Sequence, residues 1–248
     1  NDINKCLHNK PIYSCFLSPQ GKFLADFFIS NLNDHYLIEI HEKFYDSFYA
    51  KLKIYILRSN VQFKENTDLS SLIYFSKNYP LFEKNLIFFS DPRKKNLGIK
   101  IYINKFSNFL ESLKEIQEYE YQVYKKILIQ NMVPESVNDL IENKSLLLEN
   151  NFQNINAIDW DKGCYIGQEI TARMKYRALL KKKIYLLELL SGQIEPEDEI
   201  FENEINFGKV ISKIDNYLLC MLKINLVKER YKNKEKININ SSTQIKFL

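Results

Sequence analysis

The sequence is poor in the residue patterns that mark metal sites, disulfide frameworks and membrane spans. Its four cysteines, at positions 6, 15, 164 and 220, show no Cys-x-x-Cys spacing, which argues against a zinc signature, a dense disulfide framework and a cluster held by closely grouped thiolates. The three histidines form no ligand pattern either. No apolar run approaches the ~20 residues that a membrane span requires. We therefore expect no resident metal, no membrane partner and a reducing compartment.

Glycine is also scarce, with six residues in 248, and two of these six flank one cysteine. Gly163 and Gly167 enclose Cys164, so the backbone there is expected to need positive φ or close approach to another group. Hydrophobic residues make up 45% of the chain and aromatic residues 14%, which is ample for a buried core. The length suits one large domain or roughly two to three small ones.

The residues that follow Gly167 are typical of a helix. From Gln168 to Arg177 there are good helix formers and no proline, and Ile166, Ile170 and Met174 recur at the spacing of a buried stripe. A second stripe of the same helix consists of Glu169, Arg173 and Arg177. The sequence thus predicts a tight loop followed by an amphipathic helix.

Cys164 immediately precedes this helix, where exposed backbone amides and the helix dipole favour negative charge. With Lys162 beside it, the thiol is expected to be shifted toward thiolate. For each of these residues taken alone, a purely structural interpretation carries as much weight as a functional one. A lone cysteine is commonly a small buried hydrophobe, and Glu169 with Arg173 makes an ordinary i, i+4 surface pair. The combination of glycines, a thiol and a Gln-Glu pair in one segment favours function.

One stretch resembles a known family signature. Residues 162–169 are Lys-Gly-Cys-Tyr-Ile-Gly-Gln-Glu, and Thr171-Ala172-Arg173 and Tyr176-Arg177 follow. The string resembles the signature of the YgfZ-type folate-binding proteins, which belong with the aminomethyltransferase T-protein of the glycine cleavage system and with mitochondrial iron–sulfur assembly factors. Eight residues in fixed order make a specific match. Weaker similarities occur in the family's order at Asn1-Asp2, residues 17–22, Asp91-Pro92-Arg93, Val133-Pro134-Glu135 and Leu148-Glu149.

The chain departs from the family pattern at positions that bear on function. Met132 stands where the family has glycine, Leu128 where an arginine is frequent, and Ala178 where a glycine follows the Tyr-Arg pair. In the T-protein branch the early hairpin carries two adjacent aspartates used with folate, whereas this chain has Ala25-Asp26. These differences weigh against aminomethyl transfer and leave Asp26 as a candidate catalytic residue.

The resemblance implies an α+β fold, in which a ring of small domains surrounds a central folate cavity and a C-terminal antiparallel β-barrel follows. It also implies a segment before Asn1, a cofactor that is tetrahydrofolate or a folate derivative, and a position for the Cys164 loop near the cavity mouth. Carboxylate and amide groups would hold the pterin, and arginines the glutamate tail. The expected catalytic residues are Cys164 and Asp26, and the expected folate contacts are Glu149, Lys162, Gly163, Gly167, Gln168, Glu169, Arg173 and Arg177.

Three functional hypotheses follow, in order of preference. The first is a folate-binding accessory factor for the assembly or maintenance of iron–sulfur clusters, whose partners are the assembly machinery or client enzymes, tRNA-modifying enzymes among them. The alternative is a folate-dependent aminomethyltransferase or methyltransferase in which Asp26 positions the reacting nitrogen. The third is nucleic-acid binding, because residues 162–183 carry seven cations against Glu169 alone, although few aromatic residues are interleaved. We expect a monomer in the bacterial cytoplasm or, alternatively, the mitochondrial matrix.

The hydrophobic pattern predicts the order of elements. A proline-glycine turn at 18–21 separates apolar runs at 12–17 and 22–29, which indicates a hairpin. Phe44, Phe48 and Leu52 indicate a helix over 41–52. Further expectations are strands at 36–40, 53–57, 61–63, 72–75, 86–89 and 99–103, a basic turn at 93–98, a helix pair over 104–130 ended by Pro134, and mixed helix and loop over 139–152.

Beyond residue 180 the pattern changes to short strands punctuated by glycine and proline. Strands at 183–190, 205–211, 218–224 and 237–239 predict a small antiparallel barrel or sandwich, with the charge-rich stretch 228–236 as an exposed loop. We therefore divide the chain into a folate-binding α+β region, residues 1–180, and a C-terminal β-barrel domain, residues 181–248.

Overall fold

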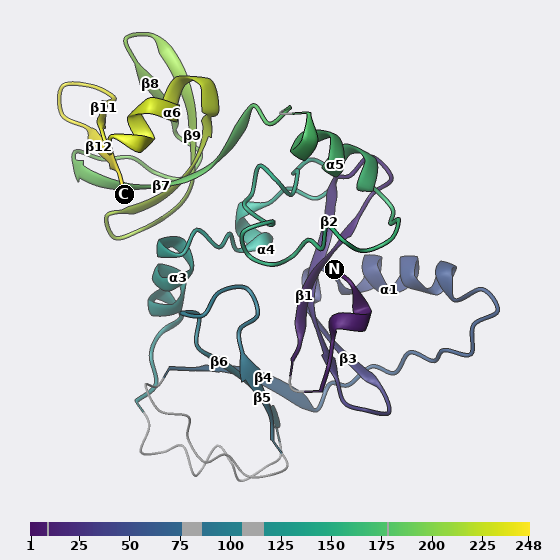
Figure 1. Ribbon diagram of the computed structural model, residues 1–248. Coiled ribbons are helices and arrows are strands. Elements are labelled where there is room, and N and C mark those ends of the chain that lie inside the picture. The colour runs from purple at the N-terminus through teal and green to yellow at the C-terminus, as the bar shows by residue number, and fades with distance from the viewer. Residues whose placement is uncertain (9, 76–85, 106–116, 178) are drawn as a thin grey trace.

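The computed structural model describes residues 1–8, 10–75, 86–105, 117–177 and 179–248 (Figure 1). Within these ranges the strands form antiparallel sheets of three, six and three strands, joined and covered by helices. The α+β class expected from the sequence is confirmed. No helix in the described ranges has the length and the apolar character needed to cross a membrane.

The first sheet contains β1 (Ile12–Leu17), β2 (Phe23–Asn31) and β3 (Tyr36–Ile40) in that order. The expected hairpin is confirmed, because Gly21 adopts a φ of 68° in the turn and the strands then pair in antiparallel register. A short 3-10 helix, η1 (Ile3–Lys5), precedes it. Helix α1 (Glu42–Ile56) packs on this sheet through Phe44 and Phe48, which are buried in the same core as the strand residues.

The second sheet has the order β4 (Leu69–Tyr74), β6 (Ile99–Asn104) and β5 (Ile87–Ser90). The expected basic turn connects β5 with β6. Partly buried polar contacts join this sheet to the first one. The Glu39 carboxylate on β3 accepts from Lys100 Nζ at 2.5 Å and from the Tyr102 hydroxyl at 2.6 Å.

In the part of the chain that the structure describes, three helices lead from this sheet to the C-terminal part. Helix α3 (Tyr121–Gln130) confirms the second half of the expected helix pair, while residues 106–116 lie outside the described residues. Met132 then adopts a φ of 52°, and Pro134 precedes the short helix α4 (Ser136–Asp139). Residues 140–167 have turns and loops and lead into α5 (Gln168–Tyr176).

The C-terminal part is a six-stranded antiparallel sheet with its own core. It is nearly closed into a barrel, because the backbone N–H of Asn238 on one edge strand donates to the Glu202 carboxylate on the other at 2.9 Å. The barrel expected from the sequence is thus confirmed (Figure 1). The strand order is β11 (Lys236–Asn238), β12 (Gln244–Phe247), β7 (Lys182–Ser191), β10 (Tyr217–Lys223), β9 (Ile205–Ile214) and β8 (Glu199–Glu202).

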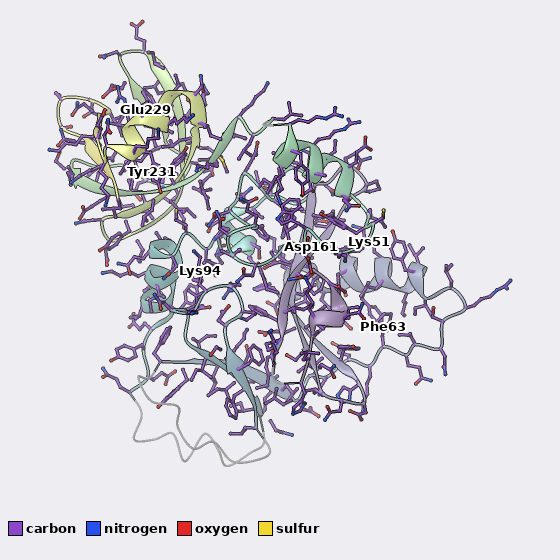
Figure 2. All side chains as sticks on the ribbon, in the orientation of Figure 1. Lys51, Phe63, Lys94, Asp161, Glu229 and Tyr231 are labelled. Atoms are coloured by element: carbon purple, nitrogen blue, oxygen red, sulfur yellow. The ribbon has the colours of Figure 1, made fainter. Side chains whose placement is uncertain are left out.

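Three local expectations are wrong. Residues 53–57, expected as a strand, continue α1 as far as Ile56, because the apolar face begun by Phe44 and Phe48 extends without a helix breaker. Residues 61–63 form no strand; the Phe63 ring lies against the Tyr49 ring of α1 instead, with centroids 5.9 Å apart (Figure 2).

The third concerns residues 228–236, expected as a loop, which lie largely in α6 (Ile224–Lys232). Val227 and Tyr231 occupy one face of this helix. They pack into the barrel core, where the Tyr231 ring meets the rings of Tyr185 and Phe247. Tyr231 is labelled on α6 in Figure 2. The charged residues that suggested a loop form the solvent face of an amphipathic helix.

Candidate functional site

The loop that carries Cys164 rests on the turn between β1 and β2. Gly167 has a φ of 82° and forms the N-cap of α5. A Cβ atom added to Gly167 would lie 2.6 Å from the carbonyl oxygen of Ser18, and one added to Gly21 would lie 2.9 Å from the carbonyl oxygen of Gly167. The absence of a side chain at Gly21 and Gly167 therefore lets the backbone of the turn and the backbone of the loop pack closer than any residue with a Cβ atom would allow.

Further contacts fix the ends of this loop. The Thr171 hydroxyl donates to the carbonyl oxygen of Gly167 at 3.2 Å, and Lys162 Nζ donates to the carbonyl oxygen of Asn1 at 2.8 Å. Tyr165 is half-buried against the core that the first sheet shares with α1, and burial raises the pKa of its hydroxyl. Cys164 lies between these anchored residues and is exposed. The loop thus presents its thiol to solvent on a supported backbone.

The face of α5 that packs against the protein differs in part from the expected one. Thr171 and Met174 face the protein, while the expected buried position Ile166 is 40% exposed. The expectation is wrong at Ile166 because the left-handed Gly167 separates that residue from the helix, so helical spacing does not apply to it. Glu169 and Arg173 form an exposed i, i+4 ion pair at 2.5 Å, which matches the simpler of the two interpretations given to them.

Cys164 is the exposed one of the four free cysteines. Cys6 and Cys220 are buried and Cys15 is half-buried, and burial raises the pKa of each of these three thiols. They are therefore protonated at neutral pH and poorly nucleophilic. In the part of the chain that the structure describes, no group of three or more His, Cys, Asp or Glu side chains is arranged to hold a metal ion.

Asp26 belongs to a separate polar cluster. The Tyr13 hydroxyl donates to its Oδ2 at 2.5 Å, across the β1–β2 pair. Burial raises the pKa of the Asp26 carboxyl, while hydrogen bonds from Ser136 and Tyr13 and the charge of Arg93 oppose that rise. Cys15 is the cross-strand neighbour of Asp26. The carboxyl thus has fixed donors and a raised proton affinity, as a proton-transfer group needs.

The neighbouring Arg93 is held by a buried ion pair. Its guanidinium binds the Asp91 carboxylate with an Nη2–Oδ2 distance of 2.7 Å, and it donates to the Tyr124 hydroxyl at 2.7 Å. The guanidinium also lies over the rings of Phe28 and Tyr13, at 5.0 and 5.4 Å. Sequence reasoning missed the roles of Tyr13, Arg93 and Ser136; the Asp-Pro-Arg triplet was the available signal, but it indicated only a hairpin.

Two cavities lie near these clusters. The larger, of about 780 Å³, lies beside η1, the start of β1 and β5, and its lining includes Lys5, Lys10, Tyr13, Phe88, Phe89 and Asn156. The smaller, of about 300 Å³, lies behind the Cys164 loop. It is lined by Asn1, Ser14, Cys15, Phe16, Leu17, Leu52, Tyr55, Leu147, Ala157, Ile158, Asp159, Lys162, Tyr165 and Ile166.

The structure brings only part of the expected site together. Lys162, Gly163, Cys164 and Gly167 share the loop, and the next residues form α5. Among the expected catalytic and folate-contact residues, only Lys162 lines a cavity in the described part of the chain, and that is the smaller one. The four expected contacts on α5 lie beside the loop, and these are Gln168, Glu169, Arg173 and Arg177.

Glu149 is placed at the start of the barrel. Its backbone carbonyl accepts from the N–H of Ile184, and its carboxylate lies 3.6 Å from Lys182 Nζ. Burial raises the pKa of the Glu149 carboxyl, while the charge of Lys182 lowers it. These contacts tie the segment before the loop to β7.

Asp139 provides a pH-dependent contact between α4 and the barrel. The N–H of Glu135 donates to its Oδ2 at 2.7 Å, and Ser212 of β9 also bonds to it. Burial raises the Asp139 pKa to about 6, so the folded state binds more protons than the unfolded state between about pH 4 and pH 6. We expect this residue to reduce the free energy of unfolding by up to about 3 kcal/mol as the pH rises through that window.

Urea unfolding of the wild type and of Asp139→Asn, each at pH 4.5 and pH 7.5, checks this expectation. The amide cannot ionise, so the stability of the variant relative to the wild type should increase at the higher pH. A difference that stays constant between the two pH values would show that the carboxyl of Asp139 does not titrate in this way.

Comparison with known proteins places the chain among proteins of related sequence and fold. No protein-family model matches it. It is 28% identical over 215 residues to an iron–sulfur cluster assembly factor IBA57 homolog, mitochondrial, of Mycosarcoma maydis, covering 81% of this chain and 52% of that protein. The IBA57 factor of Mus musculus is 27% identical over 192 residues, covering 71% of this chain and 53% of that protein. The chain spans about half the length of these curated relatives.

Among solved structures, the chain resembles the glycine cleavage system aminomethyltransferase T of Bartonella henselae. The TM-score is 0.65, the identity is 10%, and the match covers 97% of this chain and 75% of the other. At that identity the likeness shows the fold alone. Together these similarities confirm the resemblance that residues 162–169 indicated, to mitochondrial iron–sulfur assembly factors in sequence and to the glycine cleavage T-protein in fold.

Proposed function

We propose that this protein supports the assembly or maintenance of iron–sulfur clusters in client proteins, and that the thiol of Cys164 is the group through which it acts. The observation that carries the proposal is the exposure of this one thiol on a loop whose backbone is fixed by Gly21 and Gly167. The names of the relatives, which are iron–sulfur cluster assembly factors, support it.

The arrangement limits what the chain contributes chemically. Iron–sulfur clusters are commonly held by four cysteine thiolates. The three other cysteines are buried or half-buried, and the described residues contain no cluster of potential ligands. In this proposal the chain supplies at most one thiolate, and a partner supplies the remaining ligands. The cluster is then cargo shared with the partner, and the chain is an accessory factor.

We further propose that the larger cavity is the site for a folate. Its volume of about 780 Å³ lies within the roughly 300–1,000 Å³ typical of small-molecule sites. In this proposal a flat pterin lies beside the rings of Tyr13 and Phe89, and Asn156 provides an amide for its polar edge. Lys10 provides the cation for a carboxylate tail, because Lys5 is already paired with Asp159 at 2.6 Å. When bound, tetrahydrofolate would supply a reduced ring able to carry a one-carbon unit. The expected contacts Glu149, Gln168, Glu169, Arg173 and Arg177 do not line this cavity.

The compartment and the clients extend the same proposal. The relatives are named as mitochondrial proteins, which favours the mitochondrial matrix over the bacterial cytoplasm for this chain. We also propose tRNA-modifying enzymes among the clients, and the support for this is the resemblance of residues 162–169 to the YgfZ-type signature. Fractionation of cells that express the tagged full-length protein, with immunoblotting of the mitochondrial fraction, tests the location.

Complementation tests the role of the thiol. In a strain that lacks its own YgfZ-type protein, Cys164→Ser should reduce the rescued activity of an iron–sulfur enzyme at least about tenfold, the scale on which even outer-shell changes act at metal sites. Cys6→Ser is the matched control, since it makes the same substitution at a buried thiol and keeps the hydrogen bond to the carbonyl of Ile29. Control rescue should remain at the wild-type level.

Two outcomes contradict the proposal. Equal rescue by Cys164→Ser and the wild type would remove the thiol from the mechanism. Formation of methylenetetrahydrofolate from tetrahydrofolate and an aminomethyl donor, abolished by Asp26→Asn but unaffected by Cys164→Ser, would establish the transferase alternative. The raised pKa of Asp26 and its contact with Tyr13 are the observations that keep this alternative in view.

A further inference from the structure

We infer that the surface around Cys164 is a docking site for an acidic protein partner that inserts one bulky apolar side chain into the smaller cavity. This inference rests on the proposed function and specifies the chemistry of the partner. Three features of the surface carry it: the apolar cavity lined by Ile166, the aromatic cluster of Trp160 and Tyr176, and an excess of cations at the end of α5.

The smaller cavity is shaped for one side chain. Its volume of about 300 Å³ is at the lower limit of small-molecule sites, and most of its lining is apolar. Tyr55 and Ile166 line it and are 53% and 40% exposed, so apolar surface continues from the cavity to the outside. Ile166 follows Cys164 by two residues. An apolar anchor placed here brings its own chain to the thiol, and buried anchors of this kind dominate interface energetics.

The second feature is an aromatic cluster with a cation, formed by Trp160 before the loop and by Lys175 and Tyr176 at the end of α5. Lys175 Nζ lies 3.8 Å from the centre of the Trp160 ring, and the Tyr176 ring packs edge-to-face on Trp160 with centroids 6.2 Å apart. Tyr176 remains 69% exposed. Tryptophan, tyrosine and arginine are the residues most enriched in the energetic centres of interfaces. Along the chain, Cys164 thus follows Trp160 of this cluster by four residues and precedes Ile166 of the cavity lining by two.

Charge selects the kind of partner. Glu169 pairs with Arg173, and within the described ranges no carboxylate forms an ion pair with Lys175 or Arg177. The C-terminal end of α5 therefore presents uncompensated positive charge, which steers and orients an acidic surface. RNA would also be attracted by this charge, but a cavity with a mostly apolar lining offers little to a phosphate backbone. The cavity and the charge together favour a protein.

Site-specific photo-crosslinking tests the inference in the complemented strain. The full chain carries p-benzoylphenylalanine at position 166, at position 176 or, as a control, at Ile205, an exposed β9 residue of the barrel. Positions 166 and 176 should capture the same protein, identified by mass spectrometry, through a peptide with a bulky apolar residue flanked by Asp or Glu. Position 205 should not capture it.

Affinity measurements with the purified partner complete the test. Ile166→Asp and the double variant Lys175→Glu/Arg177→Glu should each weaken binding at least about tenfold, and added salt should weaken wild-type binding. Ile205→Asp should leave the affinity unchanged, and unchanged melting temperatures would exclude unfolding. Capture of RNA, different proteins at the two positions, no capture, or affinities unaffected by the variants would overturn the inference.

The two proposals fail in different ways. Full rescue by Cys164→Ser, with crosslinks from positions 166 and 176 retained, would refute the role of the thiol and support the docking surface. Loss of rescue by Cys164→Ser without crosslinks from either position would refute the docking surface and support the thiol.

Discussion

Replacing Gly167 with alanine should lower the free energy of unfolding by about 3 kcal/mol or more, because two costs add. Alanine at a φ of 82° adopts a conformation that costs about 1 kcal/mol or more, and its Cβ would lie 2.6 Å from the Ser18 carbonyl oxygen, which forces the loop off the turn. Urea unfolding followed by circular dichroism measures this loss. Rescue of the iron–sulfur enzyme should fall with it, since the loop positions Cys164.

The same loop offers a matched control. A Cβ added to Gly163 meets no atom within 4 Å, so Gly163→Ala should change stability by less than about 0.5 kcal/mol. Gly21→Ala tests the opposite side of the contact, because its Cβ would lie 2.9 Å from the Gly167 carbonyl oxygen. Equal stabilities of the Gly163→Ala and Gly167→Ala variants would contradict the packing of loop on turn.

Replacing Asp91 with alanine should cost about 3–5 kcal/mol of stability, the scale found when one partner of a buried ion pair is removed. The Asp91 side chain is fully buried and that of Arg93 is 10% exposed, so the guanidinium would remain among Tyr13, Phe28 and Tyr124 without its counter-charge. Burial alone would lower the pKa of Arg93, and the hydrogen bonds and charge of Asp91 help to hold it above its usual value instead. Unfolding of the wild type and the variant in guanidinium chloride measures this loss.

An exposed ion pair serves as the control for this loss. Glu229 and Lys232 on α6 have exposed side chains, and Glu229→Ala should cost less than about 1 kcal/mol (Figure 2). The double variant Asp91→Ala/Arg93→Met should be more stable than Asp91→Ala alone, because it no longer buries an unpaired charge. A double variant less stable than the single one would show that packing, not charge, sets the cost.

Elements with strong local patterns were predictable from the sequence. The β1–β2 hairpin has a turn signal, and β3 and α5 have a regular spacing of hydrophobic residues. Each of these signals spans only a few residues, and each element lies where its signal predicted it. The errors arose where a pattern had two meanings. The apolar residues 53–57 suit a strand as well as the last turns of α1, and charge at 228–236 concealed the buried face formed by Val227 and Tyr231.

The candidate site was predictable only in its contiguous part. The glycines and Cys164 share one motif, so a single stretch of sequence indicated the loop. The cluster of Tyr13, Asp26, Arg93 and Ser136 comes from β1, β2, the β5–β6 turn and α4, and no local spacing relates these residues. Tertiary packing alone brings them together, and the same holds for the lining of both cavities.

The contact between the β1–β2 turn and Gly167 also has a consequence for the order in which the protein folds. The turn forms from neighbouring residues, whereas its partner lies most of the chain away in sequence, and contacts of such separation form late because their loop closure is costly. During synthesis the hairpin is complete well before the loop emerges. We therefore expect the loop to dock on the turn late in folding, so that the thiol of Cys164 takes its final position only after the hairpin and its helix have formed.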